Sequence, residues 1–468
     1  MLRTTVAGVL LVSASVALAG VAPTADAARP ADVNSHFQEL ESAIARATTD
    51  AQRLPFANTP LEHANAASYI RQLAQLNLGV QLLAVDPDHP VLFRDPDPLA
   101  VLGKDPPRRS GIYDPDNISY IAIVDGTKHY RISGKRGNSV DLSVQAISGF
   151  PGAGTTGSPT ATLLRNQIAV GADGTYTIDV APTSQPGNWL ATVPQTSLIS
   201  VREAFGDWSK AVPEQLSIGV VGQRGKPSTT LTNQQMITAI DATTSAVAQQ
   251  GPYWAGLWRS LLSSFPENQV RTPMPTQGGL AGQLSSLSAF NLPVDQALVV
   301  SVGKSDALYQ GFEAADAFGQ SLPSATHQSS LNAAQAALGS DGRLHFVVSA
   351  TDPGVPNWID TQGHTHGLLF LRWQELPAPL AAADAPTSKV VPVDSVRSLL
   401  PADTPMVTPA QRKLQLARRN RDLASRLRTS SNQARGLLTD YLRQVADAVG
   451  RAPVLSIYAG SALASQLR

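Results

Sequence analysis

Alternation of apolar and polar residues is the strongest pattern in the middle of the chain, and it predicts β-strands. The stretch YIAIVDGTKHYRISG contains two such runs around Asp125-Gly126, which is typical of a hairpin. The alternation continues through SVDLSVQAI, GTYTIDV and SLISVREAF, and it returns in QALVVSV, LHFVVSA and HGLLFLRW. The runs therefore predict two β regions that are separated along the chain.

Helical patterns occupy the beginning, the middle and the end of the chain. Capping boxes at residues 59–62, 232–235 and 408–411, each a Thr followed three residues later by Glu or Gln, predict three helix starts. The stretch YWAGLWRSLLSSF predicts a second, shorter helix in the middle region. In the last segment the apolar positions share one helical face. They are Leu416, Leu423, Leu427, Ala434, Leu438, Leu442 and Val445.

Two segments share an order of residues that indicates an internal repeat. Residues 173–202 and 341–372 each begin with Asp-Gly, continue through an alternating strand and a Pro-Gly turn to Asn-Trp, and close on a strand that ends in Arg. We expect the repeated residues to serve the fold, with the tryptophans in the cores and the asparagines holding turns. They are Asn188, Trp189, Thr192 and Arg202 in one copy and Asn357, Trp358, Thr361 and Arg372 in the other.

Together these patterns predict a mainly β fold with flanking α-helices: two repeated jelly-roll-like β-sandwich units plus N-terminal, middle and C-terminal helices. The chain divides into a signal peptide, N-terminal helices with a Pro-rich strap, a first sandwich, a helical connector, a second sandwich, a linker and a C-terminal amphipathic basic helix. The corresponding ranges are 1–27, 28–110, 111–215, 216–290, 291–380, 381–407 and 408–468.

Composition and the N-terminus narrow the class of protein. Lys plus Arg equals Asp plus Glu at 36 each, and this zero net charge argues against nucleic acid as a partner. The chain has no cysteine, which excludes disulfides and thiol chemistry. Arg3, an apolar run from Val6 to Ala22 and an Ala-x-Ala site at residues 25–27 predict a secretory signal, with a retained anchor as the alternative. We expect a secreted or cell-envelope protein with no transmembrane segment after signal removal.

Four further stretches carry a resemblance to a known family. They read DPDNISYIAIVDGTKHYRISGKRGN, YQGFEAADAFGQSL, HQSSLNAAQAAL and DPGVPNWIDTQGHTHGLLFLRW. They resemble the paired domains of unknown function 1254 and 1214 of bacterial secreted proteins, most closely the actinobacterial branch dominated by the 1214 domain. The resemblance covers about residues 60–375 and implies jelly-roll-like β domains with helical additions and no established reaction. The chain departs from the family at His366, where an acidic or polar residue is expected.

The stretch NWIDTQGHTHGLLFLRW contains residue types that are typical of catalytic and metal sites. On an extended strand His364 and His366 point to the same side, and Asp360 or His345 would complete a metal site. The corresponding stretch of the first copy has no histidine, so we predict no metal and no cofactor, with His364 hydrogen-bonded within the fold. The enzymatic alternative is a hydrolase or lyase centred on His364, with Asp360 to orient it, either without a metal or with a metal ion held by His364, His366 and Asp360.

Three short motif matches lack the context that their chemistry requires. GAGTTG at residues 152–157 is not followed by a helix, and GKS at 303–305 lacks the first glycine of a phosphate loop. Ser301 and Lys304 have the spacing of a serine–lysine pair but lie at a strand exit. None of the three supports a nucleotide site or a nucleophile.

The preferred interpretation is a non-enzymatic module that binds a glycan-like ligand in a β cleft. Arginine beside aromatic rings suits sugars and carboxylates. The candidate ligand-binding residues are Tyr309, Arg372, Trp373 and Asn357. A third hypothesis is an assembly protein whose C-terminal helix, with nine basic residues between 411 and 443, docks a partner or a membrane surface.

Overall fold

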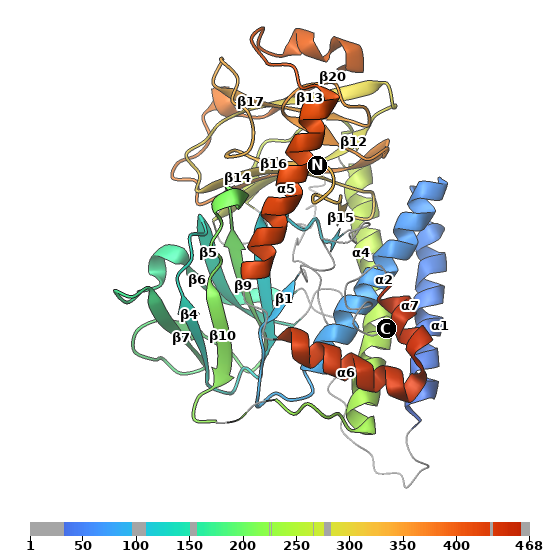
Figure 1. The fold of residues 1–468 in the computed structure, drawn as a ribbon, viewed down its shortest axis with the longest axis vertical. Helices are drawn as coiled ribbons and strands as arrows, with labels where there is room; N and C mark the ends of the chain where they lie inside the picture. Colours follow the sequence, from blue (N-terminus) through green and yellow to red (C-terminus); the bar gives the residue numbers. More distant parts are fainter. Residues whose placement is uncertain are drawn as a thin grey trace, which may run out of the picture.

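The computed structural model describes residues 32–95, 109–149, 157–223, 225, 227–264, 266–275, 282–430 and 434–459. The expected signal peptide at residues 1–27 lies outside these ranges, as does most of the glycine-rich motif at 152–157. Within them the fold is mainly β, with helices at the beginning, in the middle and at the end, as the sequence predicts (Figure 1). No helix in this part of the chain has the length and apolar character needed to cross a bilayer.

The first sandwich consists of two sheets that enclose one apolar core. The larger sheet has the order β1 (Phe93–Asp95), β3 (Asn117–Ile123), β9 (Thr196–Ala204), β5 (Asp141–Ser148) and β6 (Ser158–Leu164). The smaller sheet has the order β10 (Gln215–Val220), β4 (Tyr130–Lys135), β7 (Thr175–Ala181) and β8 (Trp189–Ala191). Buried and exposed residues alternate along β4, so Tyr130 and Ile132 point into the core and their neighbours face solvent.

The second sandwich has the same two-sheet plan around a second core. The larger sheet has the order β11 (Met274–Pro275), β12 (Gln283–Asn291), β19 (His366–Gln374), β14 (Tyr309–Ala315), β15 (Gln320–Ser321) and β2 (Arg109–Ser110), with β16 (Ser330–Asn332) paired to β14. The smaller sheet has the order β18 (Trp358–Asp360), β17 (Arg343–Ser349), β13 (Gln296–Gly303) and β20 (Thr387–Pro392). In sequence β2 lies between β1 and β3 of the first sandwich, so its pairing with β15 of the second sandwich ties the two units together.

The internal repeat has a distinctive strand pair in each copy. β7 pairs with β8 in parallel, with Asp179 opposite Trp189, and β17 pairs with β18 in parallel, with Val347 opposite Trp358. The Asp-Gly turns before these pairs place Gly174 and Gly342 at φ of 82° and 77°. Glycine adopts this left-handed conformation without the steric cost of a Cβ, which explains its place in both copies.

Five helices pack together beside the sandwiches and share one apolar core (Figure 1). They are α1 (Val33–Gln52), α2 (Pro60–Leu83), α4 (Asn233–Ser264), α6 (Ala434–Val449) and α7 (Arg451–Ile457). Leu287 and Phe370 of the second sandwich belong to the same core. Leu76 and Val80 of α2 contact strands of the first sandwich, so the bundle supports both units.

Helix α5 (Pro409–Thr429) lies apart from the bundle and runs along both sandwiches (Figure 1). Its Thr408 and Gln411 form the expected capping box. Leu423 and Leu427 enter the core of the first sandwich. Near its start, Arg412 forms an ion pair with Asp352, which follows β17 of the second sandwich.

Three segments differ from the expected arrangement. The single C-terminal helix predicted over 408–468 is divided into α5, α6 and α7 in the described part of the chain. The two expected middle helices form one helix, α4, which continues through Pro252 because Trp254 and Trp258 are buried and hold the following turns in place. The predicted linker at 381–407 contains β20, which pairs with β13, and the short 3₁₀ helix η4 (Val393–Leu399). The other 3₁₀ helices are η1 (Arg165–Gln167), η2 (Trp208–Lys210) and η3 (Ala382–Asp384).

Candidate ligand-binding cleft between the two sandwiches

Arg372, near the end of β19, is buried where the two sandwiches meet. Its guanidinium forms an ion pair with Glu313, lies 3.5 Å from Asp114 and donates to the carbonyl of Ile112. The same group lies 3.9 Å from the centre of the Phe370 ring. These contacts hold Arg372 in one orientation, and the neighbouring carboxylates raise its pKa against the effect of burial.

Arg202, the equivalent residue of the first copy, comes close to Arg372 from the other sandwich. Burial lowers the pKa of Arg202, and repulsion by Arg372 adds to this effect, while Asp114 and Asp141 partly offset it. Unlike that of Arg372, its side chain forms no hydrogen bond or ion pair with any residue that the structure describes. The repeat therefore brings two guanidinium groups together, one of them held by acids and one not.

A small hollow of about 20 Å³ lies between these arginines. Its wall is formed by Gly111, Ile112, Tyr113, Asp114, Asn117, Ser119, Arg202, Gln283, Phe370 and Arg372. Three polar atoms of residues in this wall are buried and make no hydrogen bond to the described residues: Asp114 Oδ2, which lies 3.5 Å from Arg372, Asn117 Oδ1 and Ser119 Oγ. A space of this size admits one water molecule or one polar group of a larger ligand.

A second set of buried polar contacts supports the wall of the hollow. Asp116 accepts hydrogen bonds from Trp208 Nε1 at 2.6 Å, Asn332 Nδ2 at 2.8 Å and Tyr309 Oη at 2.7 Å. Trp208 belongs to the first sandwich, whereas Asn332 and Tyr309 belong to the second. Burial, and then repulsion by Asp114, raise the pKa of Asp116 to about 7. The carboxyl therefore links the two units through three donors.

The predicted ligand-binding residues have different positions in the structure. Arg372 lines the hollow. Tyr309 does not line it, but its hydroxyl donates a hydrogen bond to Asp116. Trp373 is fully buried in the core of the second sandwich. Asn357 holds the backbone of Ala337 through two hydrogen bonds of 2.7 Å and lines a separate cavity on the outer side of that sandwich.

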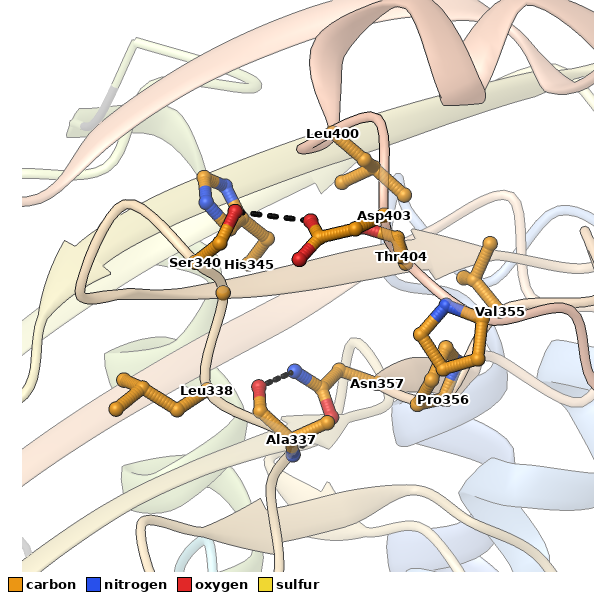
Figure 2. A pocket seen from close by; sticks show the side chains of 12 residues that line it. Ala337, Leu338, Ser340, His345, Val355, Pro356, Asn357, Leu400, Asp403 and Thr404 are labelled. Carbon is orange, nitrogen blue, oxygen red and sulfur yellow. Dashed lines mark hydrogen bonds between the residues drawn. The ribbon is translucent and has the colours of Figure 1, made fainter.

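Figure 2 shows this outer cavity, which has a volume of about 160 Å³. Ser340 donates a hydrogen bond of 2.8 Å to Asp403 at its edge. His345, which the sequence suggested as an alternative metal ligand, also lines the cavity and bonds Asp341 at 2.9 Å. Leu338, Val355 and Leu400 supply much of the remaining wall.

The histidine motif does not form the arrangement that a metal site requires. His366 Nε2 lies 3.0 Å from the carbonyl of Phe56 and 3.5 Å from Glu62, so it faces the helical bundle. Asp360 accepts from His327 Nδ1 at 2.7 Å and from the backbone of Gln362. Among the described residues, no group of three or more His, Cys, Asp or Glu is placed to hold a metal ion.

His364 is buried in the turn between β18 and β19. Its amide donates to the carbonyl of Thr361, and Thr361 Oγ1 donates to the carbonyl of His364. Thr192, the equivalent of Thr361, donates instead to the carbonyl of Gly126. The two threonines therefore share a place in the repeat but stabilise different turns.

The asparagines and tryptophans of the repeat make matching contacts in both copies. Asn188 bonds the amide and the carbonyl of Ala169, as Asn357 bonds those of Ala337. Trp189 Nε1 and Trp358 Nε1 each donate at 3.0 Å to a backbone carbonyl of the neighbouring strand. Of the repeated residues, Arg202 and Arg372 are the two that line the hollow between the sandwiches, which we call the cleft.

Several cleft residues were missed by sequence reasoning. Asp114 and Asp116 lie in DPDN and Glu313 lies in YQGFEAADAFGQSL, two stretches that supported only the resemblance to a family. Three buried arginines of α5 were also missed. Their regular spacing of seven residues could have indicated that they share one buried side of the helix, but the predicted helical face rested on the apolar residues alone. They are Arg412, Arg419 and Arg426.

Comparison with known proteins identifies the fold and nothing more specific. No family model matches the chain, and no curated protein matches it significantly. The solved structure of an uncharacterised protein from Burkholderia cenocepacia is similar, with a TM-score of 0.69 and 24% identity, over 78% of this chain and 100% of that one. The VPA0106 protein from Vibrio parahaemolyticus aligns over the same shares with a TM-score of 0.38 and 9% identity, too low to support any argument.

Proposed function

We propose that the protein is an exported, non-enzymatic module of the cell envelope or extracellular space that binds a carboxylated, sugar-like ligand between its two sandwiches. The signal-like N-terminus supports export, and the resemblance to the 1254 and 1214 domains belongs to the same proposal. The observation that carries it is Arg202, which is half-buried at the cleft without a hydrogen bond or ion pair to the described residues.

The two arginines suit a carboxylate for a physical reason. A guanidinium presents its N–H donors in a planar fork that matches the two oxygens of a carboxylate. Glu313 and Asp114 already engage Arg372, whereas Arg202 retains its donors. The hollow admits only one polar group, so the rest of the ligand lies outside it.

The test is calorimetric titration of the mature protein with galacturonate and, for comparison, galactose. We expect galacturonate to bind and galactose to bind weakly or not at all. Arg202→Gln should raise the Kd about 10- to 100-fold, the loss expected for one charge-assisted hydrogen-bonded contact. The control is Arg259→Gln, because Arg259 is an exposed cation on α4. Equal binding by wild type and Arg202→Gln would refute the proposal.

A hydrolase or lyase remains the second candidate, and one observation favours a modified form of it. Asp360 bonds Nδ1 of His327, whose side chain is 41% exposed. A carboxylate on Nδ1 orients an imidazole for proton transfer through Nε2. Asp360 therefore orients His327 where the sequence suggested His364. If catalysis occurs here, His327→Gln should abolish turnover of a polyuronate, as measured by release of reducing ends.

A further inference from the structure

One side of α5 is attached to both sandwiches by three buried arginines spaced seven residues apart. Arg412 bonds Asp352 and the carbonyl of Val355, and its guanidinium lies 5.2 Å from the Trp358 ring. Arg419 donates to the carbonyl of Ser324. Because seven residues are almost two turns, the three side chains leave the helix on the same side.

The third arginine completes the attachment at the first sandwich. Arg426 donates to the backbone carbonyls of Pro115 and Asp116. Both Arg419 and Arg426 lie over the ring of Trp208, at 4.2 and 4.8 Å from its centre. The helix is therefore held at its start, middle and end, and its orientation about its own axis is fixed.

The opposite side of α5 carries four exposed basic residues: Lys413, Arg418, Arg421 and Arg428. At 1.5 Å per residue they extend over about 22 Å along the helix, and at 100° per residue they fall within one half of its circumference. Asp422, the one acid of this helix, lies 3.6 Å from Arg421. The side chains of the other three cations form no ion pair or hydrogen bond with the described residues. We call these four residues the basic face of α5.

We propose that the basic face of α5 binds a linear polyanion, namely a carboxylate- or phosphate-bearing polymer of the cell envelope. Charge complementarity is the first reason, because four cations face solvent beside one acid on a protein of zero net charge. Preorganisation is the second reason. The buried arginines fix the helix, so its cations need not be ordered as a group when the polymer binds.

A polymer fits this face better than a membrane does. An amphipathic helix that lies on a bilayer inserts an apolar side among the lipids. The apolar residues of α5, such as Leu423 and Leu427, are already buried in the first sandwich, and Leu414 is exposed alone among the cations. The basic face is also a narrow line of charge, which matches a chain-like ligand rather than a broad surface.

The test measures binding of the full mature protein to polygalacturonate and to inorganic polyphosphate at several NaCl concentrations. Release of counterions should make log K fall with log[NaCl] with a slope of about −3, if four contacts each contribute as in single-stranded polyanions. Galacturonate monomer or orthophosphate at equal charge should bind the basic face far more weakly. The two polymers distinguish carboxylate from phosphate as the preferred group.

Two variants with the same change in net charge decide whether α5 is the site. The test variant replaces the basic face with glutamine: Lys413→Gln, Arg418→Gln, Arg421→Gln and Arg428→Gln. The control replaces exposed cations elsewhere: Arg53→Gln, Arg259→Gln, Lys304→Gln and Lys389→Gln. We expect the first variant to lose at least 10-fold in affinity and most of the salt slope, and the second to bind almost as wild type does.

Two results would overturn the proposal. The first is an equal loss in the two variants. The second is no binding of either polymer by the wild type, whether or not the protein binds vesicles with 30% anionic lipid. If the quadruple variant does not fold, the pairs Lys413→Gln/Arg418→Gln and Arg421→Gln/Arg428→Gln should each remove about half of the slope. Arg202→Gln separates this proposal from the cleft, because it should leave polymer binding to α5 unchanged.

Discussion

Replacement of Asn357 by alanine tests whether this residue serves the fold or a ligand. Its side chain is 6% exposed and makes two hydrogen bonds of 2.7 Å, one to the amide and one to the carbonyl of Ala337. Each bond contributes about 1 kcal/mol net, so Asn357→Ala should lower the free energy of local opening by about 2 kcal/mol. The loss should not be larger, because Ala337 is exposed and its freed backbone groups can bond water.

Hydrogen exchange measured by NMR is the appropriate assay, because a protein with several cores need not unfold in one step. A loss of about 2 kcal/mol corresponds to roughly 30-fold faster exchange of the Ala337 amide. Asn188→Ala is the internal comparison, since Asn188 makes the same bonds to Ala169 but is only half-buried. We expect a smaller effect there. If Asn357→Ala left the exchange of Ala337 unchanged while binding of galacturonate disappeared, the scaffold role would be refuted.

Two further predictions concern the contacts behind the cleft. Burial raises the pKa of Asp116 to about 7 and that of Glu203, a fully buried residue of β9, to about 8. The folded protein therefore holds protons that the unfolded chain releases, and the resulting stabilisation is complete below about pH 4 and is lost as pH rises through 7 to 8. A thermal midpoint that rises between pH 5 and 8.5 would contradict this prediction. In Gly311→Ala, the new Cβ would overlap the hydroxyl of Tyr309 and displace it from Asp116, which should cost about 1–3 kcal/mol in denaturant unfolding, whereas Gly219→Ala, with no atom within 4 Å of its Cβ, should be nearly neutral.

The order of strands and helices could be predicted from the sequence because the patterns that indicate them involve only neighbouring residues. Strand alternation depends on which side chains face a core, and the positive φ of Gly174 and Gly342 is a property of the turn itself. The internal repeat then predicts two β units of similar plan. Parallel pairing of β17 with β18 was not readable, because alternation identifies a strand and does not reveal the direction of its neighbour.

The cleft was only partly readable because its contacts join distant parts of the chain. Arg202 and Arg372 were found through the repeat, whereas the bond between Tyr309 and Asp116 spans 193 residues and has no local signature. The basic face of α5 was expected from composition. The buried arginines on the other side of α5 were not expected. A pattern that counts arginine as polar assigns Arg419 and Arg426 to the solvent-facing side of the helix. In the structure both are buried over the Trp208 ring.

The attachment of α5 also has a consequence for the order of assembly. A chain made from its N-terminus has produced all the strands that the structure describes by Pro392. The carbonyl of Asp116, however, accepts its hydrogen bond from Arg426, which lies 310 residues after Asp116 in the sequence. Such distant contacts form late and slow the final step of folding. We therefore expect an intermediate in which both sandwiches are formed but the ring of Trp208 is still open to solvent. Its fluorescence would report the moment at which the last helix arrives.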